Sequence, residues 1–142
     1  QLTLSQSSPL TGAVVVTTPQ DIALIDAKKG LKMFEKVNVP LLGIVENMSV
    51  FICPCCGEVT HIFGEGGAKR MSEQYGVPML GELPLSPAIR EAADSGRPTV
   101  AAEPESAAAK MYRAIARKIA GSIAKLGKDY TARMPTISVK ND

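Results

Sequence analysis

Three short apolar runs along the chain are separated by segments with helical periodicity. The runs comprise residues 12–19, 40–49 and 78–85, and each one begins or ends with proline or glycine. They are rich in valine, isoleucine and leucine, with few polar residues inside. Runs of this kind are typical of strands whose two faces are both buried. We therefore predict a strand in each of these three ranges.

Four segments carry apolar residues at helical spacing and are predicted to be helices. They comprise residues 20–37, 64–76, 86–96 and about 104–126. The resulting order is strand, helix, strand, loop and helix, strand, helix, helix, which is typical of βαβ units in a parallel α/β sheet. Three strands are few for a sheet covered on both faces, and the first residue is Gln1 rather than methionine. We therefore expect an N-terminal portion to be missing.

The chain of 142 residues has the length of one ordinary domain. We assign residues 1–126 to this domain and place a cysteine-containing loop at 48–63. Residues 127–142 show no clear periodicity, and we expect them to form a flexible tail. No internal repeat is present.

Charge is distributed unevenly along the chain. Residues 1–105 carry eight lysine and arginine residues against twelve acidic ones, whereas residues 106–142 carry eight against two. The basic residues of the last predicted helix interleave with an apolar stripe, which permits binding to a membrane surface. A helix packed on the sheet with a solvated outer face explains the same pattern, and we favour that interpretation.

Composition and cysteine usage favour a reducing compartment. No apolar run approaches the roughly 18–20 residues that span a bilayer, and the N-terminal residues lack the pattern of a signal peptide. The three cysteines do not form a disulfide framework, and close cysteines in a reducing compartment more often bind metal or do redox chemistry. We expect a cytoplasmic location.

All three cysteines lie within four residues, in the sequence Cys53-Pro54-Cys55-Cys56. Cys53 and Cys56 have C-x-x-C spacing, which lets two thiolates reach one metal from a tight turn. A structural zinc site needs four ligands, and His61 supplies at most a third. Three interpretations remain: an incomplete zinc site, an inert or redox loop, and a site completed by a second chain. A four-thiolate site between two chains suits an iron–sulfur cluster as well as zinc.

Two further motifs bear on nucleotide binding. The glycine-rich residues 64–70 lack the G-x-x-x-x-G-K-[ST] spacing of a phosphate-binding loop, and that motif is found nowhere in the chain. We interpret them as the entry to a helix. Asn47 follows the second predicted strand, where an amide can contact a nucleotide base. From the residues alone, an asparagine that caps a turn is favoured.

Several stretches together resemble the Mrp/ApbC/Nbp family of iron–sulfur cluster carriers. They are residues 10–49, the C-x-x-C loop, residues 61–98 and the closing helix, and the resemblance runs from Gln1 to about Ile119. It covers the C-terminal half to two-thirds of a family member. The family comprises P-loop ATPases with a deviant Walker motif, related to MinD and the nitrogenase iron protein. The resemblance implies the C-terminal part of a P-loop NTPase fold, with ATP bound across a homodimer.

The resemblance also implies roles for individual residues. Cys53 and Cys56 would ligate a [4Fe-4S] cluster, which is bridged by one C-x-x-C from each subunit. Asn47 would hydrogen-bond the adenine, and Pro84 and Leu85 would form a wall against the base. Cys55 departs from the family, which usually has a polar residue other than cysteine there. No residue of this chain is assigned a catalytic role.

The family's Walker A lysine and its magnesium-binding segment would lie upstream of Gln1. We therefore expect the chain not to hydrolyse ATP by itself. The implied function is an ATP-dependent cluster carrier that acts as a homodimer and transfers its cluster to apo iron–sulfur proteins, without nucleic acid or membrane partners. Zinc is an alternative metal. The alternative functions are a zinc-binding structural module and a MinD-like regulatory ATPase that binds membranes through residues 106–128.

Overall fold

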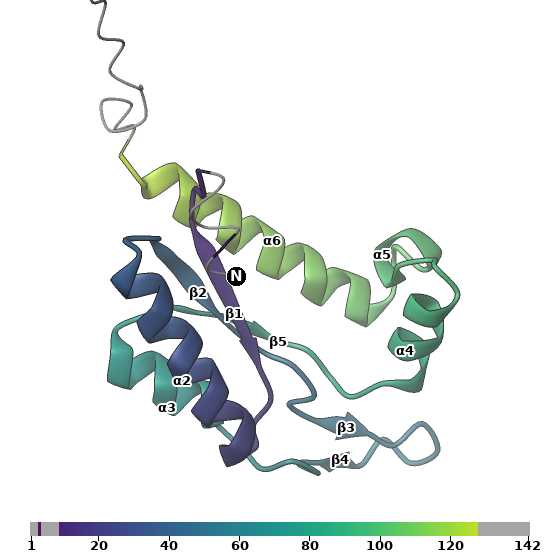
Figure 1. Cartoon of the computed structure of the whole chain (residues 1–142). Coiled ribbons are helices and arrows are strands. Elements are labelled where there is room, and N and C mark those ends of the chain that lie inside the picture. Colours follow the sequence, from purple (N-terminus) through teal and green to yellow (C-terminus); the bar gives the residue numbers. More distant parts are fainter. Residues whose placement is uncertain (1–2, 4–8, 128–142) are drawn as a thin grey trace, which may run out of the picture.

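Three parallel strands form the centre of the fold in the computed structural model, which describes residue 3 and residues 9–127 (Figure 1). The strands are β1 (Ala13–Thr17), β2 (Leu41–Glu46) and β5 (Met79–Glu82), and β2 lies between the other two. Each one falls inside a range predicted from the sequence. The prediction of an α/β fold with a parallel sheet flanked by helices is confirmed.

Helices cover both faces of this sheet. α2 (Asp21–Lys36) and α3 (Gly67–Tyr75) lie on one face, and α6 (Ala107–Lys125) lies on the other (Figure 1). Neighbouring strand residues point to opposite faces, so Ile44 packs toward α2 and α3 while Val45 packs toward α6. A sheet buried on both faces therefore explains why the strands are almost continuously apolar.

Two core clusters result from this layering. The cluster under α2 and α3 contains Val15, Leu24, Ala27, Leu31, Ile44, Ala68, Met71 and Val77. The cluster under α6 contains Val45, Leu80, Leu83 and Ile115. Tyr112 and Ile119 of α6 pack against this second cluster and are partly buried. As the favoured interpretation predicted, α6 is a helix packed on the sheet, with its charged residues on the outer side.

Two short helices connect β5 to α6. α4 (Pro87–Asp94) begins with proline at its first helical position, where the missing N–H costs no hydrogen bond. Ser86 occupies the N-cap position as predicted, but its side chain makes no capping hydrogen bond. α5 (Thr99–Ala102) was not predicted, because a helix of four residues is too short to show a periodic pattern.

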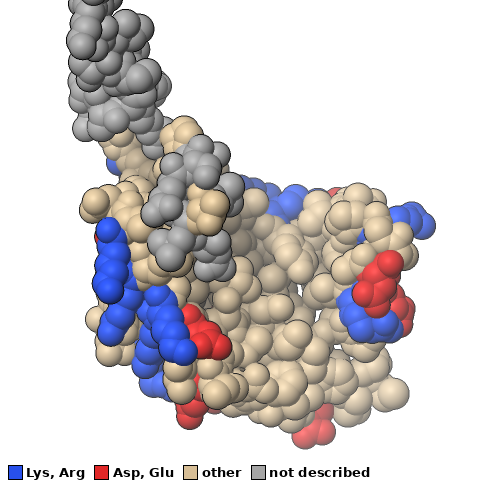
Figure 2. Space-filling model, viewed as in Figure 1, with Lys and Arg blue, Asp and Glu red and all other residues tan. Residues whose placement is uncertain are grey.

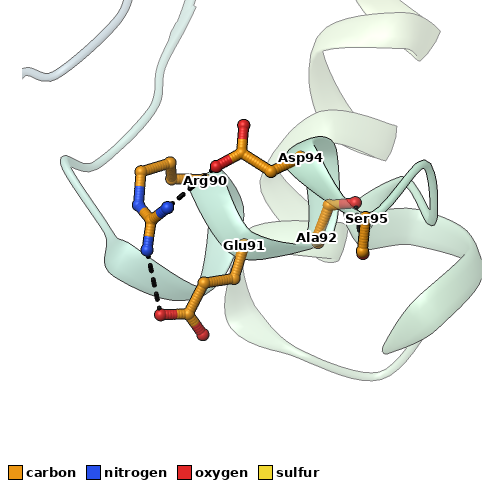
Figure 3. A network of polar contacts seen from close by, with 5 residues as sticks. All are labelled: Arg90, Glu91, Ala92, Asp94 and Ser95. Atoms are coloured by element: carbon orange, nitrogen blue, oxygen red, sulfur yellow. Dashed lines mark hydrogen bonds and ion pairs between the residues drawn. The ribbon is translucent and has the colours of Figure 1, made fainter.

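An ion-pair network lies on the exposed side of α4 (Figure 3). Arg90 donates to Asp94 at 2.8 Å and to Glu91 at 3.2 Å, and all three side chains are largely exposed. Exposed pairs contribute little, because solvent screens them and ordering long side chains costs entropy. We expect Asp94→Ala to lower the free energy of unfolding by less than about 1 kcal/mol in urea denaturation. A clearly larger loss would show that α4 depends on this network.

The structure describes only the first residue of the predicted tail, and it also tests the chain for membrane-spanning helices. The predicted flexible tail, 127–142, lies outside the described residues from position 128 onward. Within residues 3 and 9–127, no helix has the length and apolar character that crossing a membrane requires.

Candidate functional site

The carboxyl ends of the three parallel strands meet at one edge of the sheet. Thr17, Glu46 and Glu82 are the last residues of their strands and lie in register with one another. Ligands of open α/β sheets bind outside this edge, where loops rather than strands present their side chains. The candidate site is therefore built from the segments that follow these three residues.

The segment after β2 contains a β-hairpin that carries the cysteines. β3 (Phe51–Ile52) and β4 (Val59–Thr60) pair antiparallel, and the cysteine turn, residues 53–58, connects them (Figure 1). The sequence indicated only a loop in 48–63, because strands of two residues show no alternating pattern. The Cys53 N–H donates to the Glu58 carbonyl at 2.9 Å, and the Gly57 N–H donates to the Cys53 carbonyl at 2.8 Å.

The cysteine turn directs backbone amides toward one of its sulfurs. The Cys56 amide, and then the Cys55 amide, hydrogen-bond the Cys53 sulfur and hold the pKa of this thiol below its ordinary value. The side chains of Cys56 and, more weakly, of Cys55 also contact it. Cys53 is partly buried, whereas Cys55 and Cys56 are exposed. Because a thiolate is the form that binds metal, this geometry favours Cys53 as a ligand and brings Cys56 beside it.

His61 does not join the two cysteines. Its Nδ1 lies 3.3 Å from the Ser49 carbonyl, and its Nε2 lies 4.0 Å from a carboxylate oxygen of Glu65. In the described part of the chain, no three histidine, cysteine, aspartate or glutamate side chains are grouped so that they could hold a metal ion. Cys53 and Cys56 therefore form a two-thiol pair at the surface of one chain.

The hairpin is attached to the segment that follows β5. The Ser49 N–H and hydroxyl donate to the Leu83 carbonyl at 3.0 and 3.2 Å. The Leu85 N–H donates to the Val50 carbonyl at 2.8 Å, and Phe51 forms a parallel bridge with Leu85. Residues 83–85 thus lie directly beside the start of the hairpin.

Pro84 and Leu85 line a cavity of about 570 Å³ that also reaches the cysteine turn. Phe51, Ile52 and Pro54 contribute from the hairpin side, and α4, α5 and the start of α6 close the opposite side. The volume lies within the range of small-molecule sites, and most lining residues are apolar. The structure therefore places the predicted base wall and the cysteine turn at one cavity.

Asn47 lines a different cavity, which has a volume of about 900 Å³ and lies between β1 and α2. Its Oδ1 accepts a hydrogen bond from the Met48 N–H at 3.0 Å, and its own N–H donates to the Thr17 carbonyl at 2.7 Å. The side chain thus caps the turn after β2, as the interpretation from the residues alone favoured. Asn47 lies at the expected edge of the sheet, but it does not line the cavity of Pro84 and Leu85.

Sequence reasoning missed Glu46, the last residue of β2. Its side chain is 2% exposed, and Oε2 accepts a hydrogen bond from the Ala68 N–H at 2.7 Å. A glutamate that ends an otherwise apolar strand is a signal for a buried and paired carboxylate. The partner could not be found from the sequence, because Ala68 lies at the start of α3, 22 residues further along the chain.

The surface of the hairpin is apolar on both strands. Ile52 and Val59 face each other across the strand pair and are 49% and 56% exposed, and Ile62 is 52% exposed. In Figure 2 the blue side chains gather over α2, which carries four lysines, whereas the region of the hairpin is largely uncharged. Exposed apolar side chains that lie together commonly mark a surface that another molecule covers.

Known proteins similar to this chain are named for the transfer of iron or of iron–sulfur clusters. A family described as "ParA: NUBPL iron-transfer P-loop NTPase" matches residues 1–120. The iron-sulfur cluster carrier protein of Escherichia coli K12 is 58% identical over 123 residues, 87% of this chain and 33% of that protein. The mouse iron-sulfur cluster transfer protein NUBPL is 54% identical over 119 residues, 84% of this chain and 37% of that protein. The chain thus spans about a third of the length of these relatives.

Two solved structures with a similar fold are a nucleotide-binding protein and an ATPase. A nucleotide-binding protein of Archaeoglobus fulgidus in complex with ADP aligns with a TM-score of 0.59 and 39% identity, over 68% of this chain and 40% of that one. The cell division ATPase MinD of Pyrococcus furiosus aligns with a TM-score of 0.62 and 31% identity, over 78% and 43%. Both similarities agree with the predicted P-loop NTPase architecture.

Proposed function

Because the chain belongs to the ParA/NUBPL family of iron-transfer P-loop NTPases, we propose that it is part of a carrier that assembles an iron–sulfur cluster and transfers it to apo-proteins. The observation that carries the proposal is the cysteine turn, in which the Cys55 and Cys56 amides hydrogen-bond the Cys53 sulfur. This arrangement stabilises a thiolate before any metal is bound. The names of the bacterial and mouse relatives support the same function.

The cluster is a [4Fe-4S] cargo held between two copies of the chain. Cys53 and Cys56 of each copy supply four thiolates, the number that such a cluster requires. A symmetric pair brings the same surface of each copy together, and the exposed Ile52 and Val59 beside the cysteine turn provide apolar contacts for it. A cluster held at such an interface stays close to solvent, so that an apo-protein with free thiols can exchange ligands with it.

ATP binding involves the edge of the sheet next to the hairpin. The adenine lies against Pro84 and Leu85, whose apolar cavity has a suitable size. The Asn47 amide is the proposed hydrogen-bond partner of the base. Because Asn47 lines a separate cavity, it reaches a base held against Pro84 and Leu85 only if this edge of the sheet rearranges on binding; its Nδ2 donates no hydrogen bond within the described residues. The ADP complex of the similar Archaeoglobus protein supports nucleotide binding by this fold. Residues 1–142 contain no phosphate-binding motif, so magnesium binding and hydrolysis need residues beyond them.

The cellular setting follows from the same chemistry. Three cysteines within four residues, without a disulfide framework, favour a reducing compartment, and we place the carrier in the cytoplasm. Its partners are a second copy and apo iron–sulfur proteins, without nucleic acid. The apolar stripe of α6 packs on the sheet through Ile115, which disfavours the membrane-binding alternative.

Anaerobic reconstitution tests the proposed function directly. The chain is incubated with ferrous iron, sulfide and a thiol reductant and is then separated from free iron. We expect absorbance at about 400 nm, about four iron atoms per two chains, and, in sedimentation, a molecular mass twice that of one chain. One zinc per chain after incubation with both metals, without this absorbance, would instead favour the structural zinc module.

A further inference from the structure

The segment between β2 and α3, residues 47–66, leaves the sheet and returns to it at almost the same place. At its start, the Asn47 N–H donates to the Thr17 carbonyl at 2.7 Å and the Ser49 N–H donates to the Leu83 carbonyl at 3.0 Å. At its end, the Ala68 N–H donates to Oε2 of Glu46 at 2.7 Å. The side chain of Glu46 therefore connects the residue before this segment to the first turn of the helix after it.

Burial makes this connection strong and sensitive to substitution. Glu46 is 2% exposed, and Ala68 is completely buried. A carboxylate in such a place loses its hydration and needs hydrogen bonds in return. The amide at the start of α3 provides one, and the positive end of the helix dipole adds to it. An apolar side chain would fill the same space without holding the Ala68 amide.

The neighbouring residue restricts how α3 can move. A Cβ atom on Gly67 would lie 2.7 Å from the Pro19 carbonyl oxygen and 2.8 Å from a methyl carbon of Leu24. The start of α3 thus lies against the loop after β1, with no room to move closer to it. Residues 83–85 hold the start of the hairpin, whereas the Glu46 hydrogen bond holds the start of α3, to which residues 61–66 connect the other strand of the hairpin. Without the Glu46 hydrogen bond, α3 can only shift away from the Pro19 contact, and this second attachment of the hairpin is loosened.

We propose that Glu46 is a positioning residue for the iron–sulfur site: its carboxylate joins the two ends of segment 47–66 and thereby fixes the orientation in which Cys53 and Cys56 meet the cluster. The proposal rests on the proposed function, since it concerns how the same cysteines are held. Glu46 is buried and bonded to Ala68, so it acts through the segment it holds and not as a ligand. Because Asn47 follows it directly, a shift of the start of α3 is also transmitted to the candidate nucleotide residue.

The test compares Glu46→Ala with a conservative variant and a matched control. Glu46→Gln keeps a carbonyl oxygen that can accept from Ala68, and Leu31→Val shortens a buried side chain of the same core without touching the hairpin. After anaerobic reconstitution with ferrous iron and sulfide, cluster loss to an iron chelator is followed by visible absorbance. We expect the rate of cluster loss in Glu46→Ala to be at least about ten times the parent rate, which is the usual effect of removing a residue that orients a metal ligand. In Glu46→Gln and Leu31→Val the rate should stay near that of the parent chain.

A second measurement does not depend on the cluster. In the metal-free chain, hydrogen exchange of the Ala68 amide and of residues 53–60 should be faster in Glu46→Ala and unchanged in Leu31→Val. Should Glu46→Ala fail to fold, Glu46→Asp replaces it, since the shorter carboxylate keeps the charge but falls short of the amide.

Three outcomes overturn the proposal. They are cluster loss in Glu46→Ala at the rate of Leu31→Val, loss in Glu46→Gln as fast as in Glu46→Ala, and unchanged exchange in residues 53–60. Failure of the parent chain to bind any cluster would instead count against the proposed function. In that case the exchange measurement still decides whether Glu46 holds the hairpin.

Discussion

Replacing Cys53 or Cys56 with serine should abolish cluster binding, whereas Cys55→Ser should retain most of it. This is the largest effect that we expect from a single substitution in this chain. A serine hydroxyl stays protonated at neutral pH and is a poor ligand for iron, so each loss removes two of the four ligands from a symmetric pair of chains. Cys55 hydrogen-bonds the Cys53 sulfur mainly through its backbone amide, which serine retains, and a serine hydroxyl can replace its weaker side-chain contact.

Iron content and absorbance at about 400 nm after anaerobic reconstitution measure the difference in cluster binding between these variants. Far-ultraviolet circular dichroism controls for folding, and all three variants should match the parent chain, because the cysteines are exposed or only partly buried. If Cys55→Ser also abolishes cluster binding, the assignment of Cys53 and Cys56 as the ligand pair is wrong.

The chain should associate with itself through the edge of β1, and Val16→Lys should prevent this. β1 is an edge strand of the three-stranded sheet, and the side chain of Val16 is 60% exposed. A free strand edge with an apolar side chain pairs readily with another strand, either side by side or by strand exchange. A lysine at this position places like charges next to each other in the associated form and should weaken association at least about tenfold, or about 1.4 kcal/mol.

Sedimentation velocity of the metal-free, reduced chain over a range of concentrations measures this association separately from a cluster-bridged dimer. Ile123→Lys is the matched control, because Ile123 is also exposed but lies on helix α6 instead of an edge strand. The parent and control should associate with rising concentration while Val16→Lys stays monomeric. A parent chain that is monomeric throughout would contradict the prediction.

Much of the fold could be predicted because it is encoded locally. The β-branched run at Val14, Val15 and Val16 and the helical spacing of α6 follow from interactions between near neighbours in the chain. All three strands of the parallel sheet and four of the five helices of residues 9–127 lie within predicted ranges. The cysteine hairpin and α5 could not be predicted, because two-residue strands and a four-residue helix are held by contacts outside themselves. Phe51, for example, pairs with Thr60 and bridges to Leu85.

The sequence and the family resemblance named candidate site residues, but not how these residues are arranged. The C-x-x-C spacing marks Cys53 and Cys56 as candidate ligands, since two thiols three positions apart can meet in a turn, and the family resemblance is what implies that they bind a cluster. Which sulfur receives the backbone amides depends on how the turn closes at Gly57. Likewise, Asn47 and Pro84 both follow strands at one edge of the sheet, yet their side chains line different cavities.

By itself, then, the sequence determined the three strands of the sheet, the four longer helices, that the sheet is parallel, and the C-x-x-C spacing of Cys53 and Cys56, since each depends on spacing along the chain. Only the tertiary structure decided that the Glu46 carboxylate reaches the start of α3 and that His61 turns toward Ser49. It also decided that the cysteine turn shares a cavity with Pro84 and Leu85. The physical reason is that these contacts join segments 12 to more than 30 residues apart. These segments come together only when the helices pack on the sheet, so the spacing of residues along the chain does not predict the contacts between them.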